Sequence, residues 1–141
     1  MVSMGIIKDI IDVAKALFGF RDSLAKAQKD KRDQMANYFH AVSLCLAATY
    51  EDLTSNVVPH GRCAELSSYA DSLPYVVEGF IEKSKAEELS HLLKRAHCVE
   101  GMWEQFNASP EKRKELPVIA EASGIFLALS NSVRAGLRSG D

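Results

Sequence analysis

Apolar side chains recur every three to four residues along the chain, which is the spacing of an amphipathic helix. The pattern predicts helices over residues 5–18, 22–57, 61–83, 85–107 and 116–137. Because short connections join the long helices, sequential neighbours should run antiparallel. We therefore expect one all-α domain over residues 1–141, an up-down antiparallel four-helix bundle with an additional short N-terminal amphipathic helix.

Two prolines affect the expected helix boundaries. Pro59 follows the second helix and should end it, because proline cannot continue the hydrogen-bond pattern. Pro74 instead lies within residues 61–83, where the apolar stripe keeps its phase on both sides of the proline. The pattern therefore favours a single helix kinked at Pro74 over two separate helices.

The N-terminal segment, residues 5–20, reads GIIKDIIDVAKALFGF. Its apolar side chains occupy an arc of about 160° on a helical projection. The opposite side carries two positive and two negative charges, whereas a helix that binds anionic lipid usually has a polar face rich in Lys and Arg. We therefore expect this helix to pack on its own protein. The apolar set is Ile6, Ile7, Ile10, Ile11, Val13, Ala14, Leu17 and Phe18.

Two other helices offer apolar surface that could receive it. The helix over residues 22–57 is apolar on its rear as well as along its main stripe, and the last helix has a second apolar side. A helix that is apolar all round is normally covered all round. Alternatively, this surface could bind a partner or a second copy, and the N-terminal helix could swing out to a membrane about Gly19. The rear residues are Ala36, Ala41, Leu44, Ala47 and Ala48, and those of the last helix are Val118, Ile125 and Leu129.

Composition excludes some functions. The 141 residues are 47% hydrophobic and 26% charged, with a net charge of −2. No half of the chain is strongly basic, so a dedicated nucleic-acid binder is not expected. No apolar run approaches the roughly 20 residues that span a bilayer, and no secretory signal is recognisable. With three widely spaced cysteines, Cys45, Cys63 and Cys98, a cytoplasmic location with reduced thiols is expected, with peripheral membrane contact through residues 5–20 as an alternative.

Motifs for catalysis or metal binding are weak in this chain. Glu88 and His91 have the Glu-x-x-His spacing of di-iron helix bundles, but that site needs a second such pair and two more inward carboxylates. His91 should also face water, because it lies opposite the apolar stripe of its helix. The sequence has no phosphate-binding glycine loop and no Cys-x-x-Cys pair. We therefore predict no enzyme activity, no catalytic residue, no cofactor and no metal.

Three stretches, GIIKDIIDVAKALFGFRDSLAK, MANYFHAVSLCLAATYEDL and KRAHCVEGMWEQF, cover about half of the chain. Together they resemble helical-bundle effector domains that precede NACHT- or NB-ARC-type regulatory ATPase modules in bacterial conflict and programmed-death proteins. Similar N-terminal helices occur in membrane-permeabilising effectors of the HeLo-like and kinase-like necroptosis families. The resemblance implies apoptosis-like signalling through homotypic or heterotypic assembly, with membrane damage as an alternative output. The ATPase module is missing here, so the chain is either a fragment or a free-standing version.

The function that these observations favour is a non-enzymatic protein–protein interaction domain in signalling, acting through apolar helix faces. The alternative is a membrane-associating or membrane-permeabilising effector that uses the N-terminal helix. The partner in the first case is another protein or a second copy. The surface residues expected to carry the interaction are Ile7, Ile11, Phe18, Leu44 and Leu129.

Overall fold

The computed structural model describes residues 5–95 and 113–136, except for the side chains of residues 5–7 and 60. Six helices lie in this part of the chain and pack together, and no strand occurs within it. The all-α class is therefore confirmed. The helices are α1 (Gly5–Gly19), α2 (Arg21–Ala25), α3 (Lys29–Thr54), α4 (His60–Val76), α5 (Lys83–Lys94) and α8 (Leu116–Ala135).

The predicted single helix over residues 22–57 is wrong, because the chain breaks between α2 and α3. Gln28 is extended, with φ −65° and ψ 159°. The guanidinium of Arg32 donates from Nε to the carbonyl oxygen of Ala27 at 3.1 Å and so satisfies one acceptor freed by the break. Leu24 and Ala27 are both buried on the inside of this corner. Because of this bend, α2 packs on α8 instead of continuing in the direction of α3.

The predicted kinked helix over residues 61–83 is also wrong. Pro74 lies in the last turn of α4, which ends at Val76, and Gly79 then adopts φ +89°. A left-handed residue lets the chain reverse at once, so α5 begins at Lys83 and folds back on α4. Ser90 of α5 donates to the carbonyl oxygen of Ala70 at 2.6 Å across this contact.

The last two predicted helices agree in part with the structure. Of the helix expected over residues 85–107, the structure describes α5 as far as Lys94, and residues 96–107 lie outside the described part of the chain. The last helix begins at Leu116 as expected and ends at Ala135, where Gly136 takes φ +74°.

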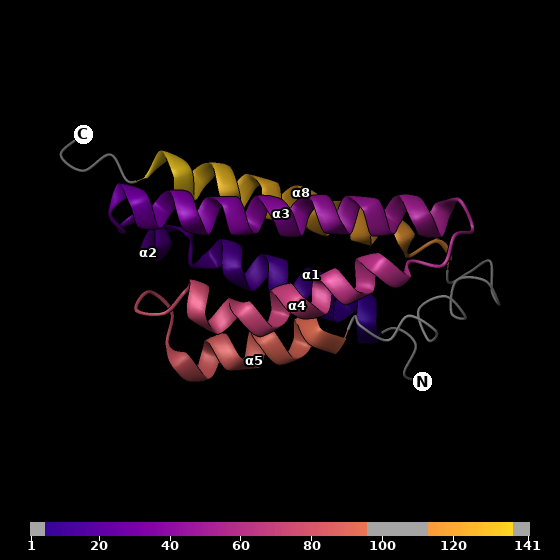
Figure 1. Ribbon diagram of the computed structural model, residues 1–141, viewed down its shortest axis with the longest axis horizontal. Coiled ribbons are helices and arrows are strands. Elements are labelled where there is room, and N and C mark those ends of the chain that lie inside the picture. The colour runs from indigo at the N-terminus through magenta and orange to yellow at the C-terminus, as the bar shows by residue number, and fades with distance from the viewer. Residues whose placement is uncertain (1–4, 96–112, 137–141) are drawn as a thin grey trace.

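Five of the helices form a closed set of contacts (Figure 1): α3 packs on α8, α4 on α3, α5 on α4, and α1 between α5 and α8. α1 is thus a full member of the core. Ile10, Val13 and Leu17 are at most 1% exposed. The expectation that the N-terminal helix packs on its own protein is met. Of the two surfaces expected to receive it, the second apolar side of the last helix does so, and the rear of residues 22–57 does not. A groove between two helices surrounds large side chains on more sides than one alanine-rich face can, so burial is greater there.

By length and composition α8 is apolar enough to cross a membrane, with a mean hydropathy of 1.4, contrary to the expectation that no segment is. In this structure the apolar side chains of α8 contribute to the protein core. Residues of α8 that face α3 and α1, among them Phe126 and Leu129, are fully buried in the shared core. A core helix of a soluble protein passes the same test.

Candidate interaction surface

The contact between α3 and α8 has a regular antiparallel register. Ser130 donates to the carbonyl oxygen of Ala36 at 2.7 Å. Seven residues further along α3, and seven back along α8, Ser43 and Ser123 each donate to the other's carbonyl oxygen at 2.8 Å. Seven residues correspond to nearly two full helical turns, so the same sides of the two helices meet again at each step.

Two arginines extend the same register to the ends of the pair. At one end Arg32 Nη1 donates to the carbonyl oxygen of Arg134 at 3.0 Å. At the other end Arg113 Nη2 donates to the carbonyl oxygen of Leu53 at 3.3 Å. Alanine and serine occupy the hydrogen-bonded positions between these ends, so α3 and α8 approach closely there, and the hydrogen bonds fix their relative position.

Beside these hydrogen-bonded positions, on the side of the α3–α8 pair that faces solvent, a second set of residues follows the same seven-residue spacing. Arg134 Nη2 donates to Asn37 Oδ1 at 3.0 Å, which joins the two helices on this side. Seven residues along α3 and seven back along α8, the same set includes Leu44 and Leu127, which are 59% and 40% exposed. These are two of the four exposed large hydrophobic residues in the described part of the chain. The register therefore places them at the same level on one face, which we call the α3–α8 outer face.

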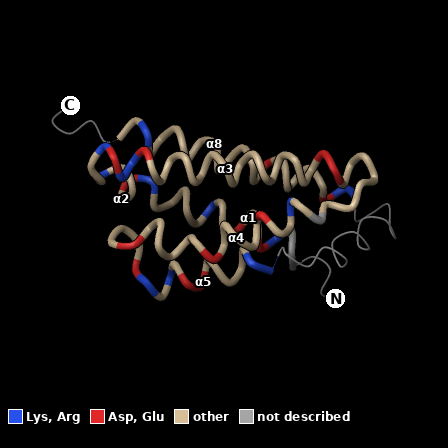
Figure 2. The backbone as a smooth tube through the Cα atoms, in the orientation of Figure 1, with Lys and Arg blue, Asp and Glu red and all other residues tan. Residues whose placement is uncertain are grey.

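The two helices themselves carry no charge along the middle of this face, and Arg62 and Glu65 of α4 border it beside Leu44. Residues 34–50 of α3 and residues 122–133 of α8 include no Asp, Glu, Lys or Arg. Figure 2 shows the central part of α3 without charged residues and charged residues near its two ends. Around the two leucines the face presents mostly small side chains. The members of the α3–α8 outer face are Asn37, His40, Ala41, Leu44, Ala47, Ala48 and Glu51 of α3, and Ala120, Gly124, Leu127, Ala128, Asn131 and Arg134 of α8, all exposed or half-exposed.

The predicted surface residues do not all lie at the surface. Leu44 does, at the centre of the α3–α8 outer face. Phe18 is half-buried, with the guanidinium of Arg21 4.4 Å from its ring centre, and lines a hollow of about 330 Å³ between α1 and α8. Ile11 and Leu129 are 8% and 0% exposed, because α1 packs on α8 and covers them. They cannot contact a partner unless the helices separate. The side chain of Ile7 lies outside the described part.

Leu127 belongs to the same apolar stripe of the last helix as Leu116 and Ile119, and the spacing of that stripe predicts a buried position for all three. Leu116 and Ile119 are buried, whereas Leu127 lies at the edge of that stripe, next to α3. Only the position of α3 decides whether the edge is covered, so the spacing of apolar residues could not identify Leu127.

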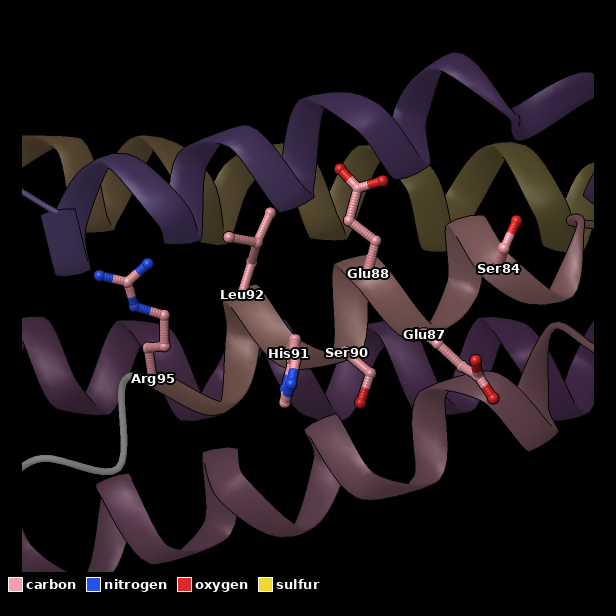
Figure 3. A pocket seen from close by; sticks show the side chains of 7 residues that line it. All are labelled: Ser84, Glu87, Glu88, Ser90, His91, Leu92 and Arg95. Atoms are coloured by element: carbon pink, nitrogen blue, oxygen red, sulfur yellow. The ribbon is translucent and has the colours of Figure 1, made fainter.

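A second depression, of about 830 Å³, lies along α5 (Figure 3) and contains the predicted Glu-x-x-His pair. Its described lining residues come from this one helix and from Arg95, which directly follows it. Glu88 points toward α1 in this view while His91 points away from it, and both are exposed. Glu88 lies 3.7 Å from Lys85. No group of three His, Cys, Asp or Glu side chains suited to a metal occurs in the described residues.

Two titratable groups that lie between α3 and α4 have strongly raised pKa values. Burial raises the pKa of the Cys45 thiol to about 12, and that thiol donates to the carbonyl oxygen of Arg62 at 3.2 Å. Burial also raises the pKa of Tyr38, whose hydroxyl donates to the carbonyl oxygen of Tyr69. Both shifts favour the neutral form, and both groups are hydrogen-bonded in the core. Cys45 and Cys63 are buried and not disulfide-bonded, and Cys98 lies outside the described residues.

No protein-family model, curated protein or solved structure matches this chain. The resemblance to helical-bundle effector domains therefore stays a prediction.

Proposed function

We propose that this chain is a non-enzymatic protein–protein interaction domain in cytoplasmic signalling, and that it binds through the α3–α8 outer face. In this proposal an up-down antiparallel bundle serves as a rigid scaffold, with α1 as an integral helix. The observation that carries the proposal is the uncharged face with Leu44 and Leu127 exposed at its centre. Depletion of charge at the core of a patch, with charges at its rim, is the composition typical of protein interfaces.

The energetics of this face suit a protein partner. Fully burying a completely exposed leucine side chain stabilises a complex by about 1.5–3 kcal/mol, and Leu44 and Leu127, 59% and 40% exposed, can each contribute part of that. Leu44 and Leu127 lie on two helices whose relative position is fixed by Ser43 and Ser123. Little conformational entropy is then lost on binding, because the backbone of the face is already ordered.

The alternative is a membrane-associating effector, and the packing of α1 disfavours it. An α1 that leaves the bundle would expose Ile10, Val13 and Leu17, which are fully buried. Exposing each large side chain costs about 1.5–3 kcal/mol of free energy. Contacts with lipid would have to offset this cost. The apolar composition of α8 is the feature that favours a membrane, but α8 holds the core together.

Photo-crosslinking tests the proposal. A photoreactive amino acid replaces Leu44, or Ser72 on the exposed side of α4 as the control, and the protein is irradiated in the cells that naturally make it. We expect a protein adduct of defined mass from position 44 only. Leu127→Glu should abolish the adduct, and Tyr75→Glu, at an exposed residue of α4 outside the α3–α8 outer face, should not.

Liposome binding supplies the opposing measurement. The interaction function predicts that the purified chain neither binds nor permeabilises anionic liposomes at physiological salt. Leakage that Leu17→Asp abolishes, together with the absence of any Leu127-dependent protein adduct, would favour the membrane effector instead.

A further inference from the structure

We infer that the partner on the α3–α8 outer face is a second copy of the same chain, docked face to face with its helices antiparallel to those of the first. This inference rests on the proposed function and adds the identity of the partner. It is carried by the placement of the charged and apolar residues along the face, which is self-complementary under a two-fold rotation.

The two exposed leucines mark the position of the rotation axis. On α3, Leu44 lies seven residues from Asn37 and seven from Glu51. On α8, Leu127 lies seven residues from Ala120 and seven from Arg134. An axis that lies in the interface and crosses both helices at the leucines therefore exchanges the two ends of the face. A two-fold interface of this kind places each leucine against its own copy.

The same rotation pairs opposite charges. Arg134 is held at one end of the face, with its guanidinium on Asn37. Glu51 is exposed at the other end. In the antiparallel arrangement the Glu51 carboxylate of the second copy comes over Asn37 and meets Arg134, and the symmetry makes this contact twice. A parallel arrangement would instead bring Arg134 to the Arg134 of the second copy, and like charges facing each other suppress that register.

The small side chains near the two-fold axis are compatible with the antiparallel dimer. The positions around the axis are occupied by Ala41, Ala47 and Ala48 on α3 and Gly124 on α8, and small residues allow helices of two copies to approach closely. The uncharged part of the face is about 24 Å long on α3 and about 17 Å long on α8 at 1.5 Å per residue, and it is about 20 Å wide for two helices. This is near the lower limit for a specific interface, so a dimer with micromolar affinity is expected.

Sedimentation velocity over a concentration series measures the self-association directly. We expect reversible dimers with a dissociation constant of about 10–100 µM. Leu44→Glu should weaken the dimer at least tenfold, because it places two carboxylates on the axis. Tyr75→Glu is the control: Tyr75 is 75% exposed on α4, outside the α3–α8 outer face, and its replacement should leave the dissociation constant unchanged.

A charge exchange tests the register. Glu51→Arg alone and Arg134→Glu alone should each weaken the dimer, because each then places like charges together at both ends. An equimolar mixture of the two single variants should recover the affinity of the original chain, since both contacts in the mixed dimer again join opposite charges. Circular dichroism and urea unfolding confirm that both variants are folded. A mixture that associates no better than either variant overturns the antiparallel register.

The failure of this inference is distinguishable from the failure of the proposed function. A chain that stays monomeric at protein concentrations several times the expected dissociation constant overturns the dimer. A Leu127-dependent adduct with a different protein would still support the interaction function. If neither a dimer nor such an adduct forms, both are overturned.

Discussion

Ser43 and Ser123 face each other across the contact between α3 and α8, and the hydroxyl of each donates to the main-chain carbonyl oxygen of the other at 2.8 Å. Each hydroxyl has one hydrogen, so the 3.1 Å approach of the two Oγ atoms follows from the closeness of the helices and needs no additional bond. The pair fixes the register that brings Leu44 and Leu127 to the same level on the outer face.

Ser123→Ala should therefore lower the free energy of unfolding by about 1 kcal/mol, the net contribution of one such hydrogen bond. Ser123→Val should cost more, about 1–3 kcal/mol, because the added methyl groups force two closely packed helices apart. Urea unfolding monitored by circular dichroism measures both. Ser72→Ala, at an exposed serine that donates to Ser68 within α4, is the control and should change the stability little. Equal effects at Ser72 and Ser123 would mean that the α3–α8 contact is not tight.

Leu17→Ala should destabilise the protein by about 2–5 kcal/mol, because Leu17 is fully buried between α1 and the rest of the core. The replacement leaves a cavity that the surrounding helices fill only in part. Lys15→Ala, two residues away on an exposed position of α1, is the matched control. Thermal and urea unfolding should show a single lowered transition for Leu17→Ala. An unchanged transition would show that α1 does not belong to the cooperative core and would support its release.

Gly136→Ala should destabilise the end of α8. Gly136 has φ +74°, which alanine adopts only at a cost, and an added Cβ would come 2.3 Å from Nη1 of Arg32. That guanidinium is already bonded to the carbonyl oxygens of Ala27 and Arg134, so it cannot move away without losing contacts. We expect a loss of about 1–2 kcal/mol in urea unfolding. Gly61→Ala in α4, where nothing lies within 4 Å, should be neutral or slightly stabilising. A larger loss of stability for Gly61→Ala than for Gly136→Ala would contradict this prediction.

Cys45 should resist alkylation in the folded protein at about pH 8, since the thiolate is the reactive form. Burial raises the pKa of its thiol from 9.0 to about 12, so the folded state retains a proton that the unfolded state loses. The contribution of this thiol to stability is complete below pH 9 and is lost as the pH rises from about 9 to about 12. Iodoacetamide labelling followed by peptide mapping, with and without urea, measures the difference at Cys45. Rapid labelling without urea would contradict its burial.

Periodic spacing of apolar residues was sufficient to predict the helical class, the first helix and the start of the last one. It also predicted that α1 packs on its own protein, because a wide apolar arc with balanced charges has a large burial energy and no electrostatic preference for lipid. These are properties of a helix taken alone. The exposure of His91 to solvent followed from the same local pattern.

The tertiary structure decided what local pattern could not. The break at Gln28 and the end of α4 at Val76 depend on where the chain must turn to reach its neighbours, and a stripe that keeps its phase across a turn gives no sign of it. α1 entered the groove between α5 and α8, and this buried Ile11 and Leu129. The burial of an apolar residue at the edge of a stripe depends on the position of the adjacent helix, so only the register of α3 against α8 could place Leu44 and Leu127 together in solvent.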